Sequence, residues 1–440
     1  MRAPFLSRLL RSALTAALVM LALPAAAVPT AVFPQAGAPP GPPIALTGAS
    51  VINVEDGSVI QNAVVLIDGD RIKAIGPAGS VQLPADVRKI ALDGKWLAPG
   101  LLNMHVHFGL KLPGAAGAAL ADENDMQLAL RMADNARKSL YAGVTTVRLT
   151  GEEHGSDFAL KGAIDGGAAL GPRIHTAGEI IVPTGGHGDL EADGAAEMAK
   201  VVREQIKRGA TWIKVAISGG ISDSHGSIAA SPMLPEEMRT IIEVAHRNGV
   251  KVTAHNGSPI AADEAIALGI DCFEHAYHLT DKQLKAMKAA GTWLVPTAVV
   301  IDEGAMEFYK KIGSPPWYLD RVRSTRIDHH KMLQTAIKLG VNIALGTDQF
   351  PFEPNAGTTA TVHEAELYVA AGMSPLDALR AATMNPARML GVEKDVGSLA
   401  AGHYADLIAI DGNPAQDIST LRTIKFVMKG GQVIRDEVTK

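Results

Sequence analysis

Cysteine is nearly absent from this chain of 440 residues, in which Cys272 is the only one. The protein therefore has no internal disulfide framework. An excess of basic residues is also missing, because 41 Lys and Arg stand against 46 Asp and Glu, for a formal net charge of −5. Without a basic stripe to neutralise phosphates, nucleic acid is not an expected partner.

The apolar run near the N-terminus, Ala13 to Leu23, is too short to cross a bilayer comfortably. Arginines precede this run and the small residues 25–27 follow it, which is the order of a secretory signal. We therefore expect a signal peptide over residues 1–27 that is cleaved near Ala27. The mature protein is then exported, either periplasmic or secreted, and has no membrane anchor.

What is present indicates a compact globular protein, since 47% of the residues are hydrophobic and only 20% are charged. Residues 28–43 are rich in Pro and Gly and are typical of a linker. Short β-branched runs separated by turn residues fill residues 44–98 and return in residues 396–440. Neither segment supplies enough strands to be stable alone, so we expect them to pair into one small β-sandwich domain.

Residues 99–395 instead alternate expected strands with amphipathic helices, most of which end in Gly. The eight expected strands are the one ending near His107 and those at 145–150, 173–182, 212–219, 251–256, 272–277, 292–300 and 342–348. The pattern predicts an α/β fold, a (β/α)8 TIM barrel. A doubly wound open sheet is the alternative, but neither GxGxxG nor GxxxxGK[ST] follows any of these strands.

Polar residues gather at the carboxyl ends of the expected strands, where barrels of this kind place their sites. These residues are His105, His107, Lys214, His255, His275 and Asp348. His105 and His107 are two apart in a strand and therefore point to the same side. The branched aliphatic neighbours of Lys214 suit the helical layer, which turns the lysine into the barrel.

Each of these residues has an ordinary explanation when it is taken singly. An H-x-H pair can be a satisfied polar pair, a lysine at a strand end can reach water, and Asp348 can form a turn. Burying all of them together would cost many kcal/mol without a compensating centre. Because neutral imidazole and carboxylate are preferred zinc ligands, the set predicts a metal site.

The same residues, strand by strand, resemble the ligand set of binuclear members of the amidohydrolase superfamily. More narrowly, the chain resembles the prolidase-like and ochratoxinase-like branch, which is related to imidazolonepropionase. The resemblance runs from about residue 44 to the C-terminus, and its motifs are "APGLLNMHVH", "TGGHGD", "WIKV", "EHAYHL", "TMNPARMLG" and "ADLIAIDGNP". One departure is Leu149, which stands after "TTVR" where an aspartate is expected.

The resemblance implies two divalent metal ions, with Zn²⁺ the expected metal, and a CO2-derived carbamate on Lys214 that bridges them. His105, His107 and Asp348 would hold the more buried metal, and His255 and His275 the more exposed one. A metal-bridging hydroxide would attack the substrate, with Asp348 as the catalytic proton acceptor and donor. Family resemblance also implies a homo-oligomer.

The function implied is a metal-dependent amidohydrolase that cleaves the amide bond of N-acyl amino acids or dipeptides and releases a C-terminal amino acid. It would act as a carboxypeptidase or dipeptidase, and ochratoxin-type amides are included. The metals, carbamate, Asp348 and hydroxide leave a positive centre, which favours a small-molecule substrate with a carboxylate. The candidate substrate contacts are His187, His225, Tyr277, His278 and Arg148.

Several alternatives stay open on the sequence. The same metal pair could serve a lactonase or a phosphotriesterase, whereas a mononuclear deaminase would not require Lys214. The chain could also be a non-catalytic exported barrel that binds a ligand or serves a structural role. Outside the site, we expect Cys272 to be packed and His329 and His330 to lie on a solvated helix face.

Overall fold

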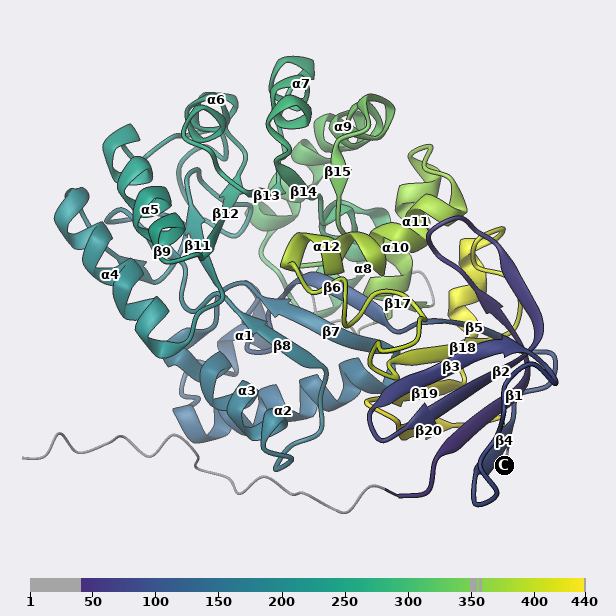
Figure 1. Ribbon diagram of the computed structural model, residues 1–440. Coiled ribbons are helices and arrows are strands. Elements are labelled where there is room, and N and C mark those ends of the chain that lie inside the picture. The colour runs from purple at the N-terminus through teal and green to yellow at the C-terminus, as the bar shows by residue number, and fades with distance from the viewer. Residues whose placement is uncertain (1–40, 349–353, 356–357, 439–440) are drawn as a thin grey trace, which may run out of the picture.

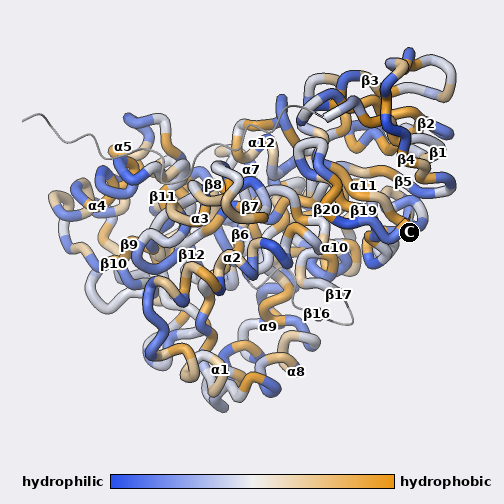
Figure 2. Tube along the Cα trace, turned by 90° about the horizontal axis from the view of Figure 1, so that it is seen from below, coloured by the Kyte–Doolittle hydropathy of each residue, from blue (hydrophilic) through white to orange (hydrophobic). Residues whose placement is uncertain are grey.

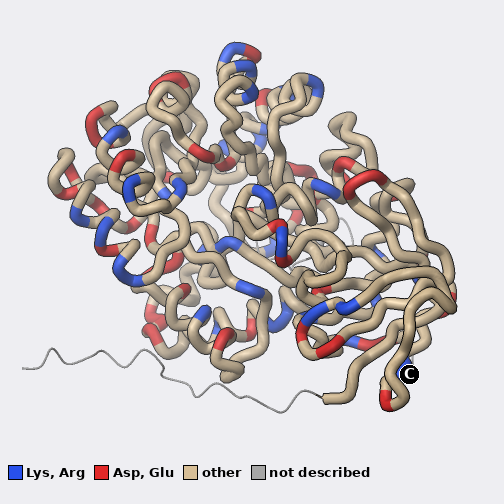
Figure 3. Tube along the Cα trace, viewed as in Figure 1, with Lys and Arg blue, Asp and Glu red and all other residues tan. Residues whose placement is uncertain are grey.

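The computed structural model describes residues 41–348, 354–355 and 358–438, which form a barrel with a β-sheet domain beside it (Figure 1). The expected signal peptide and most of the linker lie outside the described residues. No helix in the described ranges is both long enough and apolar enough to cross a membrane. Charges of both signs are interspersed over the outer helices (Figure 3).

The barrel strands are parallel to one another and follow the expected order along the chain. They are β6 (Leu101–Val106), β7 (Val144–Leu149), β8 (Arg173–Thr176), β9 (Ile181–Val182), β11 (Trp212–Ala216), β12 (Lys251–Asn256), β13 (Cys272–His275), β14 (Trp293–Val295) and β15 (Asn342–Ile343). The third barrel strand is divided, because β8 pairs with β7 while β9 pairs with β11. The ring closes where Met104 N donates to Leu345 O at 2.8 Å. The predicted (β/α)8 barrel is confirmed.

Helices surround the barrel strands on the outside (Figure 1). They are α2 (Asp125–Tyr141), α3 (Ser156–Asp165), α4 (Gly194–Arg208), α5 (Pro235–Arg247), α6 (Pro259–Ala267), α7 (Asp281–Ala290), α9 (Pro316–Leu339), α10 (Ala360–Ala370), α11 (Pro375–Ala381) and α12 (Met384–Leu390), with α1 (Ala115–Ala118) and α8 (Glu303–Lys311) near the site end. Local signals explain their limits. Asn124 accepts from Gln127 N at the start of α2, while Gly209 ends α4 in the left-handed conformation.

The faces of β11 show why Lys214 points inward. Ile213 and Val215 belong to the large core that the strands share with the helices, whereas Trp212 packs with residues of the barrel interior such as Met104. Since side chains alternate along a strand, Lys214 shares the inner face with Trp212. Its exposed fraction is 1%, so the predicted inward orientation is confirmed.

The two terminal segments pair as expected, through the antiparallel contact of β5 with β18. The strands of this domain are β1 (Ile44–Ile52), β2 (Val59–Asp68), β3 (Arg71–Pro77), β4 (Arg88–Ala91), β5 (Trp96–Pro99), β18 (Leu407–Ile410), β19 (Phe426–Lys429) and β20 (Gln432–Asp436). They form one mixed hydrogen-bonded sheet rather than the two separate sheets of a sandwich. The pairing of β1 shifts register twice near Gly48, whose φ is +82°, so β1 can bend and pair with β4 and then β5.

The sheet domain buries a core of its own. Its buried hydrophobic residues come from both terminal segments, for example Leu46 and Leu97 from the first and Leu407 and Phe426 from the second. Several of its strands are among the hydrophobic segments of the chain in Figure 2. Because each segment completes the core of the other, the chain must leave this domain, form the barrel and return to it.

An ionic cluster around the buried His363 joins α10 of the barrel to the 3-10 turn Ile418–Thr423 of the C-terminal segment. His363 Nε2 lies 3.0 Å from Asp302 Oδ2, and its Nδ1 lies 3.3 Å from Glu366 Oε2. Glu366 in turn accepts two hydrogen bonds from Arg422. Burial disfavours the charged imidazole, but the two carboxylates outweigh burial and raise the pKa of His363 to about 9.

Replacing His363 with glutamine is expected to destabilise the protein in a pH-dependent way. The folded pKa lies above the unfolded value of about 6.5, so the stabilisation is complete below that pH and is lost as the pH rises through about 9. The Tm difference between wild type and His363→Gln should therefore be largest in mildly acidic buffer and vanish near pH ~10. Thermal unfolding across this range measures it, with the exposed His330→Gln as control, and a pH-independent difference would contradict the assignment.

Candidate metal centre and substrate pocket

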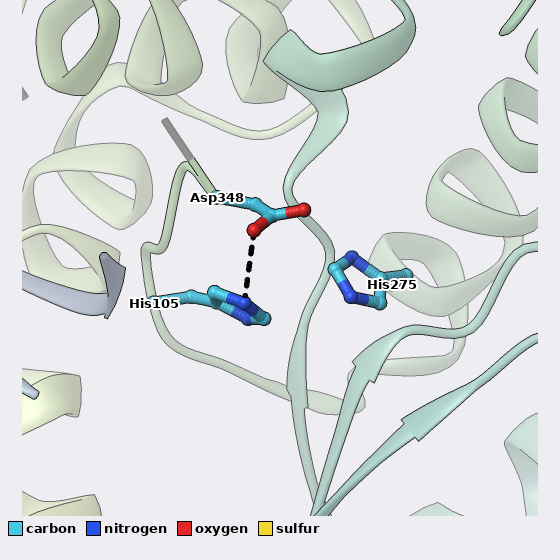
Figure 4. A group of neighbouring side chains, drawn as sticks. All are labelled: His105, His275 and Asp348. Atoms are coloured by element: carbon cyan, nitrogen blue, oxygen red, sulfur yellow. Dashed lines mark ion pairs between the residues drawn. The ribbon is translucent and has the colours of Figure 1, made fainter. Parts of the chain in front are cut away.

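His105 and His107, at the end of β6, direct their Nε2 atoms to one point, where these atoms lie 3.1 Å apart. Asp348 reaches the same point from the segment that follows β15. Its Oδ1 lies 3.2 Å from the Nε2 atom of each histidine. Figure 4 shows the carboxylate over His105 with His275 beside it. Gly346 permits this approach, since a Cβ there would lie 2.8 Å from the Cβ of His105.

The hydrogen-bond partners fix which nitrogen of each ring carries the proton. His105 Nδ1 lies 2.7 Å from a carboxylate oxygen of Glu274, and His107 Nδ1 lies 2.7 Å from the carbonyl oxygen of Gly151. Both partners only accept, so both Nδ1 atoms donate. In the neutral rings each Nε2 atom then carries a lone pair, and the two lone pairs face each other and the carboxylate of Asp348. Three electron-rich atoms this close together need a positive charge. In the metal-free protein a proton can supply it, since Asp348 outweighs burial and raises the pKa of His107, and a divalent metal ion would supply it in a metal site.

His275 and His255 follow the same rule. His275 Nδ1 donates to the hydroxyl of Thr297 at 2.7 Å, because that hydroxyl already donates to the carbonyl of Pro296. Nε2 of His275 therefore carries a lone pair and no proton. His255 is turned the other way, since its Nε2 donates to Gly219 O at 3.0 Å and its Nδ1 stays free of the proton. Burial lowers the pKa of both rings well below the usual histidine value, which keeps them neutral as metal ligands must be.

Ring distances bring these histidines into one group. The ring of His275 lies 4.9 Å from that of His105 and 4.5 Å from that of His255, centre to centre. His105, His275 and Asp348 each offer a ligand atom within 4.8 Å of the others. The sequence therefore predicted the members of one spatial cluster, and their roles as metal ligands stay a prediction.

Lys214 completes the cluster from β11. Among the described residues its ammonium has neither a hydrogen bond nor an ion pair, although Glu274 and Asp348 act on it electrostatically. Burial lowers its pKa, which favours the neutral amine. A neutral amine is the form that reacts with CO2, so this lysine fits the carbamate that the family resemblance implies. The donor set as a whole fits divalent metal ions.

The backbone departs from ordinary strand geometry where the ligands stand. The φ angles of His275 and Asp348 are +63° and +51°, in the left-handed region that non-glycine residues rarely adopt. At His275 this ends the alternation of β13, so that Glu274 and His275 both face the centre. Local strain of this kind persists where surrounding structure holds it and is typical of functional sites.

Two buried carboxylates that were not predicted from the sequence belong to the site. Glu274 is fully buried, and Arg148 and His105 outweigh that burial and hold the pKa of its carboxyl well below the usual range. Glu152 accepts from Gly109 N at 2.9 Å, just after the H-x-H pair, and burial raises its pKa to about 7. A signal for Glu274 existed in the sequence, since a glutamate inside the apolar strand "CFEH" needs a partner.

A cavity of about 470 Å³ opens above the cluster. Three of the ligand candidates line it, namely His107, His255 and Asp348. One wall is aromatic and aliphatic, with Tyr277, Tyr309, Tyr318, Leu112, Ile221 and Val300. Five carboxylates also line the cavity, against one lysine, Lys111; they are Glu152, Glu153, Glu179, Asp189 and Asp223. Three of them have basic partners, since Glu153 pairs with Lys111, Glu179 with Arg208 and Asp223 with His187.

The five predicted substrate contacts divide into two groups. Tyr277 lines the cavity and stacks on His275 at 5.0 Å between ring centres, and His187 lines it with Nδ1 2.6 Å from Asp223 Oδ1. The other three do not line it. Arg148 is fully buried against Glu274, His225 pairs with Ser224 on an exposed loop, and His278 lies 3.2 Å from Asp328. A guanidinium paired in the interior cannot also reach a substrate carboxylate.

The expectation of a solvated face for His329 is wrong. His329 is 1% exposed, and its Nε2 lies 3.0 Å from His275 O and 2.8 Å from Pro296 O. It therefore supports the backbone beside a ligand candidate. The packed position of Cys272 is confirmed, and burial raises the pKa of its thiol to about 12.

Comparisons with known proteins agree with this geometry. The sequence pattern of the Amidohydrolase family matches residues 96–434. An ochratoxinase of Aspergillus niger is 29% identical over 434 residues, covering 86% of this chain and 84% of that protein. A solved Xaa-Pro dipeptidase with bound methionine has a TM-score of 0.82 and 29% identity, covering 89% of this chain and all of the other. A prolidase complexed with N-methylphosphonate-L-proline has a TM-score of 0.80 and 27% identity, covering 90% and 100%.

Proposed function

Because this chain belongs to the amidohydrolase family, we propose that it is a metal-dependent hydrolase that releases a C-terminal amino acid from dipeptides or N-acyl amino acids. The observation that carries the proposal is the set of imidazole lone pairs that meet at Asp348 below the cavity. The similarity to proteins named dipeptidase, prolidase and ochratoxinase supports an amide as the substrate.

His105, His107 and Asp348 would hold one divalent ion, and His255 and His275 a second, with the Lys214 carbamate between them. Zn²⁺ is the proposed metal. When bound, such ions polarise the scissile carbonyl and lower the pKa of water.

Asp348 can then move the proton that the reaction releases. Its Oδ1 faces the histidines, and its side chain also lines the cavity, so the carboxylate reaches both the ligand cluster and the substrate space. Burial opposes the charged form of Asp348, but the positive charge that His105 and His107 can carry in the metal-free protein outweighs burial and holds the pKa of Asp348 well below its usual range. A bound metal ion would supply that charge in place of the protons. The residue therefore starts as a base, takes a proton from the attacking water and delivers it to the nitrogen of the leaving amine.

The residues that line the cavity restrict the substrate further. The tyrosine wall suits an apolar or aromatic group, as in hydrophobic N-acyl amino acids and ochratoxin-type amides. The carboxylates that line the cavity outnumber its one lysine and disfavour a second negative charge on the acyl part, because like charges repel in a partly enclosed site. A single carboxylate on the leaving amino acid is compatible with the positive metal centre.

A hydrolysis panel with metal analysis on the same purified sample tests this function. We expect N-butanoyl-Phe and Met-containing dipeptides to be cleaved, with N-succinyl-Phe cleaved much more slowly because of its added charge. Chelation should remove activity, and zinc or manganese should restore it. An acyl-homoserine lactone and paraoxon serve as rival substrates, and a preference for either would assign the centre to a lactonase or a phosphotriesterase. A sample without metal or activity would favour the non-catalytic barrel.

We also propose that the mature protein is exported after cleavage near Ala27 and that it forms a homo-oligomer. The support is the arginine-then-apolar order of the first residues and the resemblance of the chain to its family. Sequencing the N-terminus of protein recovered from the culture fluid or periplasm tests the first, and sedimentation tests the second. An intact N-terminus in the cytoplasm, or a monomer, would refute the respective proposal.

A further inference from the structure

Behind His105, on the side away from the cavity, lies a buried ionic network. Glu274 is fully buried on β13, and its Oε2 accepts the Nδ1 proton of His105 at 2.7 Å. Its other oxygen, Oε1, accepts from the guanidinium of Arg148 and the hydroxyl of Thr253. The two oxygens of one carboxylate thus have separate partners, and Oε2 serves the histidine.

Arg148 fixes this arrangement from β7. It is fully buried, its Nε donates to Met104 O at 2.8 Å, and its guanidinium lies 4.6 Å from the ring centre of Trp212. Met104 precedes His105 in the chain. Arg148 therefore holds the backbone next to His105 and, through Glu274, the side chain of His105 as well.

We propose that Glu274 is a positioning residue that selects the Nδ1–H tautomer of His105, and that Arg148 holds the carboxylate of Glu274 in place. Selecting this tautomer keeps the Nε2 lone pair directed at His107 and Asp348, where a metal would bind. Nothing in the reaction requires Glu274 to touch substrate, and it does not line the cavity. The inference rests on the proposed metal site, although the tautomer itself can be measured without metal.

The variant Glu274→Gln tests the proposal because the hydrogen-bond partners around residue 274 predict that His105 would lose its Nδ1–H tautomer. Arg148 only donates, so the amide oxygen of the glutamine would occupy the Oε1 position beside the guanidinium. The amide NH2 would then face His105 Nδ1, which could only accept. The proton would move to Nε2, and the lone pair would point away from the ligand cluster.

Two measurements read out this change. Metal affinity, from competition with a chromophoric chelator, should fall about 10- to 100-fold in Glu274→Gln, as for other carboxylates that orient metal-ligating histidines. Nitrogen-15 NMR of the metal-free protein should show the proton of His105 on Nδ1 in wild type, with His105→Gln used to assign the signal. Glu274→Asp, which keeps the charge, should recover part of the affinity, and the exposed Glu236→Gln should leave it unchanged.

The outcomes separate the possibilities. A wild-type metal-free protein with the His105 proton on Nε2 would overturn the proposal even if Glu274→Gln does not fold. A folded Glu274→Gln with wild-type affinity would overturn it too and would leave Glu274 as a structural ion-pair partner. If wild type binds no metal at all, the proposed function fails, while the NMR result still decides the role of Glu274.

Discussion

Lys214→Ala should lose one or both metal ions and most of the activity, with kcat/KM lower on the order of 10³-fold, because metal stabilisation of a transition state is worth several kcal/mol. The structural reason is that the amine of Lys214 is buried among ligand candidates and has no partner within the described ranges. A bridging carbamate would give it one. Metal analysis and kinetics on the same sample measure both losses.

The carbamate has a test of its own, since it forms from CO2 and the neutral amine. Metal-free wild type should regain activity faster when metal is added with bicarbonate than when it is added in CO2-free buffer. ¹³C-bicarbonate should label wild type and leave Lys214→Ala unlabelled. The exposed Lys200→Ala is the matched control. Wild-type metal content and kinetics in Lys214→Ala would refute the bridging role and leave the lysine as a counter-charge to Glu274 and Asp348.

The barrel could be predicted because its signals are local and repeat. Each unit carries a β-branched run, an amphipathic helix and often a glycine stop, such as Gly209 after α4. The ligand candidates followed from one further rule, that the carboxyl ends of parallel barrel strands meet at one face. Lys214 was placed by the alternation of β11, which holds through the middle of a regular strand.

The residues that support the ligand candidates were not predicted, because the alternation of side chains between the two faces of a strand fails where the strand ends. The left-handed φ of His275 turns Glu274 and His275 to the same centre, which no strand pattern predicts. Arg148, like Lys214, is a polar residue of a barrel strand, and only its burial and its partner Glu274 distinguish a network member from a substrate contact. His329 lies on the long α9, where its burial depends on the backbone of β13 and on Pro296, two segments distant in the sequence.

Asp348→Asn should lower kcat roughly 10³-fold, within the range for loss of a general acid-base. Asparagine is the suitable replacement because it tolerates the φ of +51° at this position and keeps an oxygen ligand while removing the charge. The backbone contact of residue 348 with His105 O at 2.8 Å should persist. Metal content is therefore expected to fall much less than kcat.

The leaving group distinguishes proton transfer by Asp348 from a purely structural role. An alkyl amide must have its nitrogen protonated before it leaves, whereas a nitroanilide leaves with little help from an acid. The loss in Asp348→Asn should thus be several-fold smaller for a nitroanilide than for an alkyl amide of the same acyl group. Asp86→Asn on an exposed loop is the control. Equal losses for both substrates would mean that Asp348 acts by holding metal and leaves the leaving amine to another donor.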